Sequence, residues 1–352
     1  MMQPVPMCEF TDEENDARLD AGGSNRTDLR AIDVHVHYLP PRYRGLVVGA
    51  GISKPDGHVG GVPEWSAEAH LEHMERLGIE TSVVSISTPG VEFTGELPDG
   101  ILAARTANEE GAELVAAHPG RFGFYAALPA SDVDAALAEL EYADDELGAW
   151  GVSLLSNVRG TYIGDPSLEP LWAELSRRSM PVLIHPTQPS NLVEGVMEGW
   201  SKSMYEYFFD STRAIIGLIF SGMLERNPGV KLVVPHAGAA LPALARRIER
   251  NVWRANRLEP GSHPSFVGSL QNCYFDLAGS VVPYQLPSLL SLIDDTRILA
   301  GSDYPFTGHQ MGAELMADLR TTELLSPEQK RRILRTNAGA VFPQLAESGV
   351  AL

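Results

Sequence analysis

From Leu29 to the C-terminus, short apolar runs alternate regularly with longer amphipathic stretches. Most of the short runs are rich in Val, Ile and Leu and are bounded by Gly or Pro, which is typical of strands buried on both faces. Eight such runs occur: AIDVHVH (31–37), SVVSIS (82–87), FGFYAALP (122–129), GVSLLSN (151–157), PVLIHPT (181–187), KLVVPHAG (231–238), CYFDLAG (273–279) and RILAGSDYP (297–305). The pattern favours a parallel sheet, because helical sequence separates each run from the next.

Between these runs, apolar residues recur three and four positions apart, as they do on one face of an α-helix. The clearest examples are AEAHLEHMERLG, DVDAALAELEYADDELG and PSLEPLWAELSRRS, and SPEQKRRILRTNAGAVF supplies a closing helix. Eight strands separated by helices predict an α/β fold, the (β/α)₈ TIM barrel. A doubly wound open sheet is the second choice, but the sequence lacks the glycine-rich phosphate turn expected after its first strand.

The chain is expected to contain a short tail and one domain. Residues 1–28 are acidic and carry few large apolar side chains, so we expect a disordered tail. Residues 29–352 then form a single barrel, a fold that routinely exceeds 250 residues. A long Gly- and Pro-rich insertion, residues 38–66, follows the first strand and is expected to form a lid or a wall of the pocket.

The formal net charge of −19 restricts the partners of the protein. Nucleic-acid backbones and anionic membranes require basic surfaces, so neither is expected to bind. No stretch approaches the roughly 18 apolar residues that a membrane span needs. The first residues also lack the basic start and apolar core of a secretory signal. We therefore expect a cytoplasmic protein whose partner is a small molecule.

Histidines gather at the C-terminal ends of the predicted strands. His35 and His37 share the first run, and residues two apart on a strand point to the same face. His185 ends the fifth run, His236 the sixth and Asp303 the eighth. In a barrel these ends meet on one rim, where active sites of this fold lie. Three of these four imidazoles and the carboxylate suit one divalent metal ion, Zn²⁺ in first place and Mn²⁺ or Fe²⁺ as alternatives.

The segments IDVHVHYLPP, IHPT, VVPHAG and LAGSDYPF together resemble the amidohydrolase-related (amidohydrolase 2) family, which includes aminocarboxymuconate-semialdehyde decarboxylase. The resemblance runs from about residue 31 to 343. Within the family, HYLPPRY, DPSLEPLWAEL, FDSTRAIIGLIFSG and NPGVKLVVPHAGAALP are most similar to the 6-methylsalicylate decarboxylase branch.

This resemblance implies a role for individual positions. The positions that match the metal ligands of the family are His35, His37, His185 and Asp303. His236 matches a histidine that acts in acid/base chemistry beside a metal-bound water. Arg247 matches an arginine that reaches the pocket of the neighbouring subunit and binds the substrate carboxylate, which implies at least a homodimer.

The sequence also departs from the family pattern. Before the first helix, the semialdehyde decarboxylase carries an arginine that grips its substrate, whereas this chain offers Lys54 and His58. The semialdehyde is therefore not the expected substrate. Binuclear relatives bridge two metals with a Lys or Glu at the end of strand 4. Here that strand ends in Leu155, Ser156 and Asn157, which favours a single metal.

One metal in this setting supports two kinds of chemistry. It can hold the phenolate and carboxylate of an aromatic acid while Asp303 or His236 protonates the carboxyl-bearing ring carbon and CO₂ leaves. It can also lower the pKa of a bound water toward about 7 and deliver hydroxide to an ester, thioester, amide or activated C–C bond. The resemblance favours nonoxidative decarboxylation of a salicylate-like acid, and metal-dependent hydrolysis is the alternative.

Three further residues are candidates for contact with the carboxylic acid or acyl substrate. Arg159 follows strand 4 on the catalytic rim, and His309 lies just past the eighth run. Phe208 lies in the segment after strand 5, where it could form a wall of an aromatic pocket.

Other polar residues are expected to be structural. His70 and His73, three apart on the first helix, are predicted to lie on the outer surface of the barrel. Asp33 lies two residues before His35 and is expected to point inward below the ligands. It either supports a ligand imidazole or belongs to the barrel floor.

Overall fold

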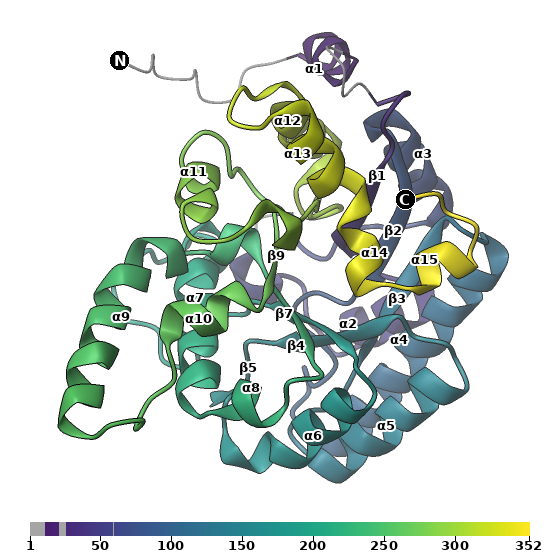
Figure 1. Ribbon diagram of the computed structural model, residues 1–352. Helices are drawn as coiled ribbons and strands as arrows, with labels where there is room; N and C mark the ends of the chain where they lie inside the picture. The colour runs from purple at the N-terminus through teal and green to yellow at the C-terminus, as the bar shows by residue number, and fades with distance from the viewer. Residues whose placement is uncertain (1–10, 21–25, 59) are drawn as a thin grey trace.

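The central sheet of the protein consists of eight parallel strands, in the order β1-β2-β3-β4-β7-β8-β9-β10. The computed structural model describes residues 11–20, 26–58 and 60–352 (Figure 1). Its strands are β1 (Ala31–His37), β2 (Ile79–Ser85), β3 (Phe122–Ala127), β4 (Gly151–Leu155), β7 (Pro181–His185), β8 (Lys231–Val234), β9 (Tyr274–Asp276) and β10 (Ile298–Leu299). Each strand overlaps one of the eight predicted runs, and the predicted (β/α)₈ barrel is confirmed.

The barrel closes at a seam between its first and last strands. Asp33 in β1 forms a parallel bridge with Ala300, the residue after β10, and the Val34 amide donates to the Ala300 carbonyl at 3.0 Å. The buried Asp33 carboxylate reinforces this seam, because its Oδ1 accepts the backbone N–H of Ser302 at 3.1 Å. Asp33 Oδ1 also accepts the backbone N–H of His35 at 3.3 Å, so this carboxylate both reinforces the seam and holds the backbone of a ligand residue.

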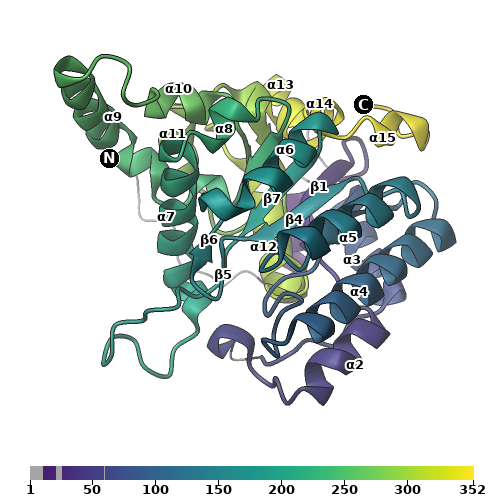
Figure 2. The same cartoon turned by 90° about the horizontal axis from the view of Figure 1, so that it is seen from below.

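Helices surround the sheet (Figures 1 and 2). The longer ones are α3 (Ala67–Leu77), α4 (Leu97–Ala117), α5 (Val133–Asp145), α6 (Glu169–Arg177), α7 (Glu206–Phe220), α9 (Leu241–Leu258) and α12 (Gly308–Thr321). The other helices that follow the first strand are α2 (Pro41–Gly49), α8 (Met223–Arg226), α10 (Phe266–Gln271), α11 (Gln285–Leu290), α13 (Pro327–Arg331), α14 (Ala338–Val341) and α15 (Gln344–Glu347). Over the described ranges, no helix combines the length and apolar character needed to cross a membrane.

The start and end of α3 show how the local sequence fixes an element. Ser66 caps its first turn by accepting the Ala69 amide at 3.1 Å. Gly78 ends it with φ of 66°, a left-handed conformation that favours glycine. A Cβ atom at this position would lie 2.3 Å from the Cβ of Arg26, so glycine is also required for the close approach of the chain.

The end of the barrel opposite the histidines is sealed by the C-terminal segment. Phe342, which follows α14, is fully buried. Its ring centroid lies 5.8 Å from that of Tyr125 and 6.3 Å from that of Trp150. Together with inward-facing strand residues these rings form one continuous apolar cluster: Ile32, Val34, Val83, Leu183, Val233 and Leu299.

Part of the predicted N-terminal tail is folded. Residues Asp12–Leu19 form helix α1, which starts with a capping box between Thr11 and Glu14 and ends with the fully buried Leu19. Helix α1 packs on α12, and Arg18 forms an ion pair with Asp318. The expected disorder is therefore wrong for these residues, because Leu19 gains a buried apolar position. Residues 1–10 and 21–25 lie outside the described residues.

Candidate metal centre and active site

The four residues expected as metal ligands come together at one end of the barrel. His35 and His37 lie in β1, His185 ends β7, and Asp303 follows β10. One ligand atom from each residue lies within 4.8 Å of those of the other three. An oxygen of Asp303 lies 3.1 Å from His37 Nε2 and 3.9 Å from His35 Nε2. All three imidazoles are buried, whereas the Asp303 side chain is partly exposed.

Asp276, at the end of β9, fixes the position of His35. Its Oδ2 lies 2.8 Å from His35 Nδ1, and both side chains are fully buried. Its Oδ1 accepts the backbone N–H of His236 at 3.0 Å and that of Ala278 at 3.1 Å. A carboxylate that accepts a hydrogen bond from one ring nitrogen leaves the other nitrogen free to bind a metal. Asp276 therefore directs Nε2 of His35 toward the cluster.

Two serines hold the other ligand imidazoles. Ser85 Oγ lies 3.0 Å from His37 Nδ1, and Ser87 Oγ lies 3.3 Å from His185 Nε2. These serines lie at the end of β2 and in the loop after it. One strand and its loop thus hold a ligand ring of the adjacent strand β1 and a ligand ring of β7 on the other side of the barrel mouth.

The residues of the cluster fit a divalent metal ion. Nε2 of His35 and Nδ1 of His185 are buried and have no hydrogen-bond partner within the described part of the chain. Burying a polar nitrogen atom costs free energy unless the atom forms a hydrogen bond or binds a metal. Burial lowers the pKa of His35, but the carboxylates of Asp276, Asp303 and Asp33 outweigh burial and raise it to about 9. The same negative charges favour a metal cation in place of that proton.

His236 and Asp303 face each other at the edge of this cluster. His236 Nε2 lies 3.9 Å from Asp303 Oδ2. Both residues have left-handed backbones, with φ of 54° and 60°. Non-glycine residues rarely adopt this conformation, and it is concentrated at functional sites. Burial raises the pKa of Asp303, but the imidazoles of His236, His37 and His35 lower it well below its usual range, so the carboxyl is ionised at neutral pH.

The cluster opens into a cavity, here called the metal cavity, that has an aromatic wall. Phe208 stacks on His236 with ring centroids 5.6 Å apart and planes inclined by 22°. Phe306 lies edge-on to His37, with centroids 5.6 Å apart. The lining also includes His58 of the insertion, Ser87, Thr88, Met204, Tyr207, Gly279, Ser280, Gln285, Thr307 and Met311. A flat apolar wall beside a charged centre suits a planar aromatic acid.

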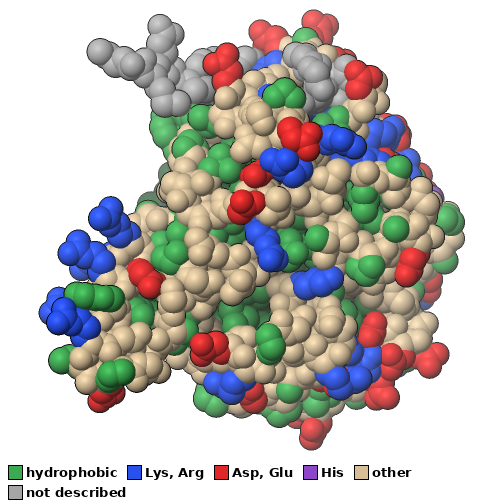
Figure 3. Space-filling view, in the orientation of Figure 1, with side chains coloured by type: hydrophobic (Ala, Val, Ile, Leu, Met, Phe, Trp, Pro, Cys, Tyr) green, Lys and Arg blue, Asp and Glu red, His purple; other side chains and the backbone are tan. Residues whose placement is uncertain are grey.

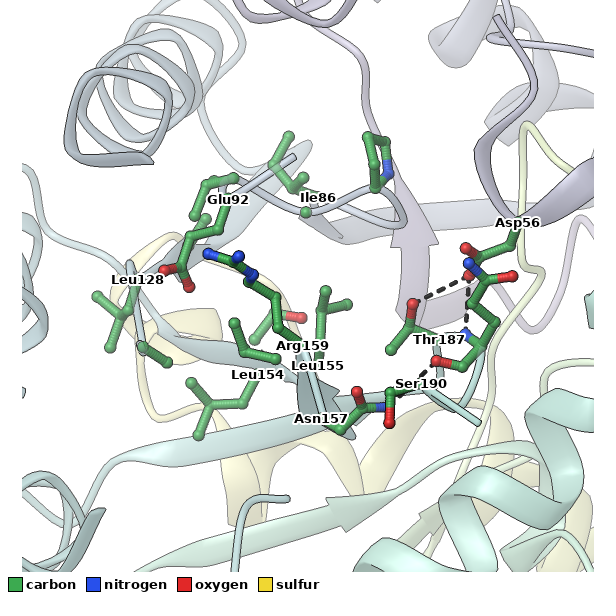
Figure 4. Close-up of a pocket in the computed structure, with 18 of the residues that line it drawn as sticks. Asp56, Ile86, Glu92, Leu128, Leu154, Leu155, Asn157, Arg159, Thr187 and Ser190 are labelled. Atoms are coloured by element: carbon green, nitrogen blue, oxygen red, sulfur yellow. Dashed lines mark hydrogen bonds between the residues drawn. The ribbon is translucent and has the colours of Figure 1, made fainter. Parts of the chain in front are cut away.

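Three residues that the sequence marked as substrate contacts lie elsewhere. Arg159 lines a second cavity (Figure 4), because the β5–β6 hairpin (Asn157–Val158 and Thr161–Tyr162) turns it away with φ of 54°. Its Nη1 donates to the Gly95 carbonyl at 2.8 Å. His309 begins α12, where its Nδ1 lies 3.1 Å from His73 Nδ1. Arg247 is exposed on α9, a helix that projects from the body of the molecule (Figures 1 and 2).

His70 and His73 are buried, so the prediction of a surface position is wrong for both. They lie on the buried face of α3, in register with Met74 and Leu77. The Trp65 indole donates to His70 Nδ1 at 3.1 Å, and burial lowers the pKa of His70 to about 3, so its ring is neutral. His73 is stacked at 4.0 Å on Tyr304, the residue that follows the ligand Asp303.

Sequence reasoning missed two contributors to the site. Asp276 lies in the predicted run CYFDLAG, where a lone carboxylate among buried apolar residues signals a paired charge. Tyr207 lines the metal cavity one residue before Phe208, and no pattern in the sequence distinguishes it from its neighbours.

The chain is similar to known proteins in both sequence and fold. The family model described as amidohydrolase matches residues 32–344. A 6-methylsalicylic acid decarboxylase from Penicillium expansum is 33% identical over 322 residues, covering 90% of this chain and 97% of that protein. A solved amidohydrolase II superposes with a TM-score of 0.83 at 33% identity, covering 88% of this chain and 99% of that one.

A further solved structure shares the fold and contains a metal. It is a dihydroxybenzoic acid decarboxylase from Polaromonas sp. JS666 with bound manganese and the inhibitor 2-nitroresorcinol. Its TM-score is 0.75 at 24% identity, and the match covers 90% of this chain and 97% of that one. With the family model matching nearly all of the barrel, this chain belongs to the amidohydrolase family.

Proposed function

We propose that this chain is a metal-dependent nonoxidative decarboxylase of a small aromatic acid that carries a hydroxyl group beside its carboxyl group. One observation carries the proposal: the cluster of His35, His37, His185 and Asp303 opens onto an aromatic wall. The 33% identity to a 6-methylsalicylic acid decarboxylase supports decarboxylation over the alternative, metal-dependent hydrolysis.

The metal would be held by the four residues of the cluster. When bound, it supplies positive charge that draws a carboxylate and a neighbouring phenolate oxygen to one point. Three imidazoles and one carboxylate suit Zn²⁺, whereas the relative from Polaromonas contains manganese. Zinc therefore stays a prediction, with manganese and iron as its competitors.

His236 is the group best placed to deliver a proton. Phe208 packs on its ring, and its Nε2 faces the ionised carboxylate of Asp303. The proton passes from Nε2 to the ring carbon that bears the carboxyl group. The bond between this carbon and the carboxyl carbon then breaks, its electron pair restores the aromatic ring, and CO₂ leaves.

Arg247 supports a homodimer. It does not line the metal cavity of its own chain, although it matches a substrate-binding arginine of the family. Figure 3 shows basic side chains gathered where α9 projects from the molecule. The exposed arginines of this helix are Arg246, Arg247, Arg250, Arg254 and Arg257. In the proposed dimer, Arg247 enters the metal cavity of the partner chain and binds the substrate carboxylate.

Light scattering after gel filtration tests the dimer, and Arg247→Ala tests the role of the residue. Arg247→Ala should raise KM for the aromatic acid at least tenfold without changing the metal content. Arg254→Ala, on the same exposed helix, is the matched control. A monomeric active protein, or an Arg247→Ala variant with unchanged KM, would contradict this role.

The proposed reaction is tested by elemental analysis followed by a CO₂-release assay with a panel of hydroxybenzoates. We expect one metal per chain, CO₂ release from acids with an ortho hydroxyl group, and a loss of at least about 10²-fold in His236→Asn. The exposed His263 provides the matched control, His263→Asn. One metal per chain without CO₂ release from any aromatic acid, but with cleavage of aryl esters, would favour the hydrolase.

A further inference from the structure

A carboxylate from the insertion joins two segments beside the metal cavity. Asp56 lies in the short 3₁₀ helix η2 (Pro55–Gly57). Its Oδ2 accepts hydrogen bonds from Tyr207 Oη, Thr187 Oγ1 and the Gln188 amide, each at 2.9 Å. Tyr207 belongs to α7, whereas the other two donors follow β7, the strand that ends in a ligand histidine. One oxygen atom therefore connects the insertion to helix α7 and to the segment that follows β7.

The backbone at Asp56 is held in an uncommon conformation. Its φ is 49°, in the left-handed region that non-glycine residues rarely occupy. Such a conformation persists only where the surrounding structure enforces it. The three converging donors provide that enforcement, and the backbone in turn presents the carboxylate to them.

The hydrogen bonds leave the Tyr207 hydroxyl fully occupied. Asp56 Oδ2 can only accept, so the Tyr207 proton points toward it. Thr88 Oγ1 lies 2.9 Å from Tyr207 Oη and donates to it. Burial and the Asp56 carboxylate raise the pKa of Tyr207 well above its usual range, so the phenol stays neutral. Tyr207 thus contributes its ring, which lies 6.2 Å from that of His185, rather than a proton.

These four side chains, Asp56, Thr88, Thr187 and Tyr207, are here called the latch, and they stand between two cavities. Tyr207 and Thr88 line the metal cavity. Asp56 and Thr187 line the second cavity, whose other walls include Leu155 and Arg159. Figure 4 shows Thr187 hydrogen-bonded to Asp56 at one side of this second cavity, across from Arg159. The latch is therefore a hydrogen-bonded partition between the metal cavity and the second cavity.

We propose that Asp56 is a positioning residue that determines substrate specificity. Through the latch it holds the Tyr207 ring as a fixed wall of the metal cavity and so limits the size of the ring substituents that a substrate can carry. The class of ligand, aromatic acids, rests on the proposed function. Without the carboxylate, the Tyr207 ring is free to move, the partition opens toward the second cavity, and bulkier acids are accepted.

The test compares a small acid, 6-methylsalicylate, with a bulky one, 6-phenylsalicylate, on the metal-loaded protein. Dissociation constants are measured by calorimetry, and kcat and KM by CO₂ release. Asp56→Gly removes the carboxylate and suits the left-handed backbone. Tyr207→Phe removes the hydroxyl but keeps the ring. In both variants we expect the preference for the small acid to fall about tenfold or more, with unchanged metal content.

Three further variants make the test specific. Asp56→Asn keeps one acceptor oxygen and should retain most of the preference. The double variant Asp56→Gly/Tyr207→Phe should lose no more than either single variant, because both break the same hydrogen bond. Tyr205→Phe makes the same change two residues away, outside both cavity linings, and should behave as wild type. If Asp56→Gly fails to fold, Tyr207→Phe and Thr187→Val carry the test.

The outcomes separate this proposal from the proposed function. Selective binding without CO₂ release would reject the decarboxylase and leave the latch standing. A preference that changes less than twofold in folded Asp56→Gly and Tyr207→Phe, or losses that add in the double variant, would overturn the latch alone. Equal binding of both acids by the wild type would also overturn it, and binding of neither acid would reject both proposals.

Discussion

Replacing Asp276 by Asn should weaken metal binding by a predictable amount. Asp276 uses both oxygens as acceptors, one for His35 Nδ1 at 2.8 Å and the other for the amides of His236 and Ala278 at 3.0 and 3.1 Å. Asparagine offers only one oxygen, so its NH₂ group must face either His35 or the two amides. Facing His35, it stabilises the tautomer whose proton occupies Nε2, the atom that a metal needs. We expect affinity to fall about 10–100-fold, which is about 1.4–2.7 kcal/mol.

Chelator competition on the purified variant measures this loss. Glu139→Gln is the matched control, because Glu139 is also a buried carboxylate but bonds to Asn108 and Arg105 between outer helices, away from the ligands. Its affinity for metal should equal that of the wild type. If Asp276→Asn bound metal within threefold of the wild type, His35 would be positioned without help from Asp276, and the assigned role would be refuted.

Two further predictions follow from the same structure. Metal affinity should rise with pH up to about 9, because a metal displaces the proton of His35, whose pKa in the metal-free protein is about 9; a flat profile in titrations at pH 7, 8 and 9 would contradict this competition. Phe342→Ala should lower the free energy of unfolding by about 3–5 kcal/mol, because it empties a fully buried position beneath the barrel. Chemical denaturation measures that change, and a loss below about 1 kcal/mol would show that the barrel floor is not tightly packed there.

The fold and the ligand cluster could be predicted because they depend on local patterns. Buried strands produce apolar runs of characteristic length, and a period of two places His35 and His37 on one face. The barrel then brings the ends of distant strands to one rim, so His185 and Asp303 could be added without knowing any contact. The resemblance to a known family favoured decarboxylation over hydrolysis, and the identity to a 6-methylsalicylic acid decarboxylase supports that choice.

The remaining features depend on packing between distant segments. Asp276 ends a strand of only three residues, and its partner His35 lies 241 positions away. Arg159 was expected on the rim near the metal, but a two-stranded hairpin turns its side chain into another cavity.

His70 and His73 follow the buried stripe of α3, yet their polarity favoured a surface position. Helix α1 is stabilised by burial of Leu19 against the barrel, a contact that composition alone does not reveal. A cytoplasmic location stays a prediction.

The position of the metal centre at the seam of the barrel also bears on the stability of the fold. His35 and His37 lie on the first strand, and Asp303 lies just past the last, 266 positions from His37. A metal ion held by these residues would therefore act as a reversible cross-link between the first and the last strand of the barrel. Loop-closure entropy grows only slowly with length, so even this long loop could be closed by one ion. Parting the first strand from the last would then require losing the metal, and opening of the barrel and release of the ion would become a single event.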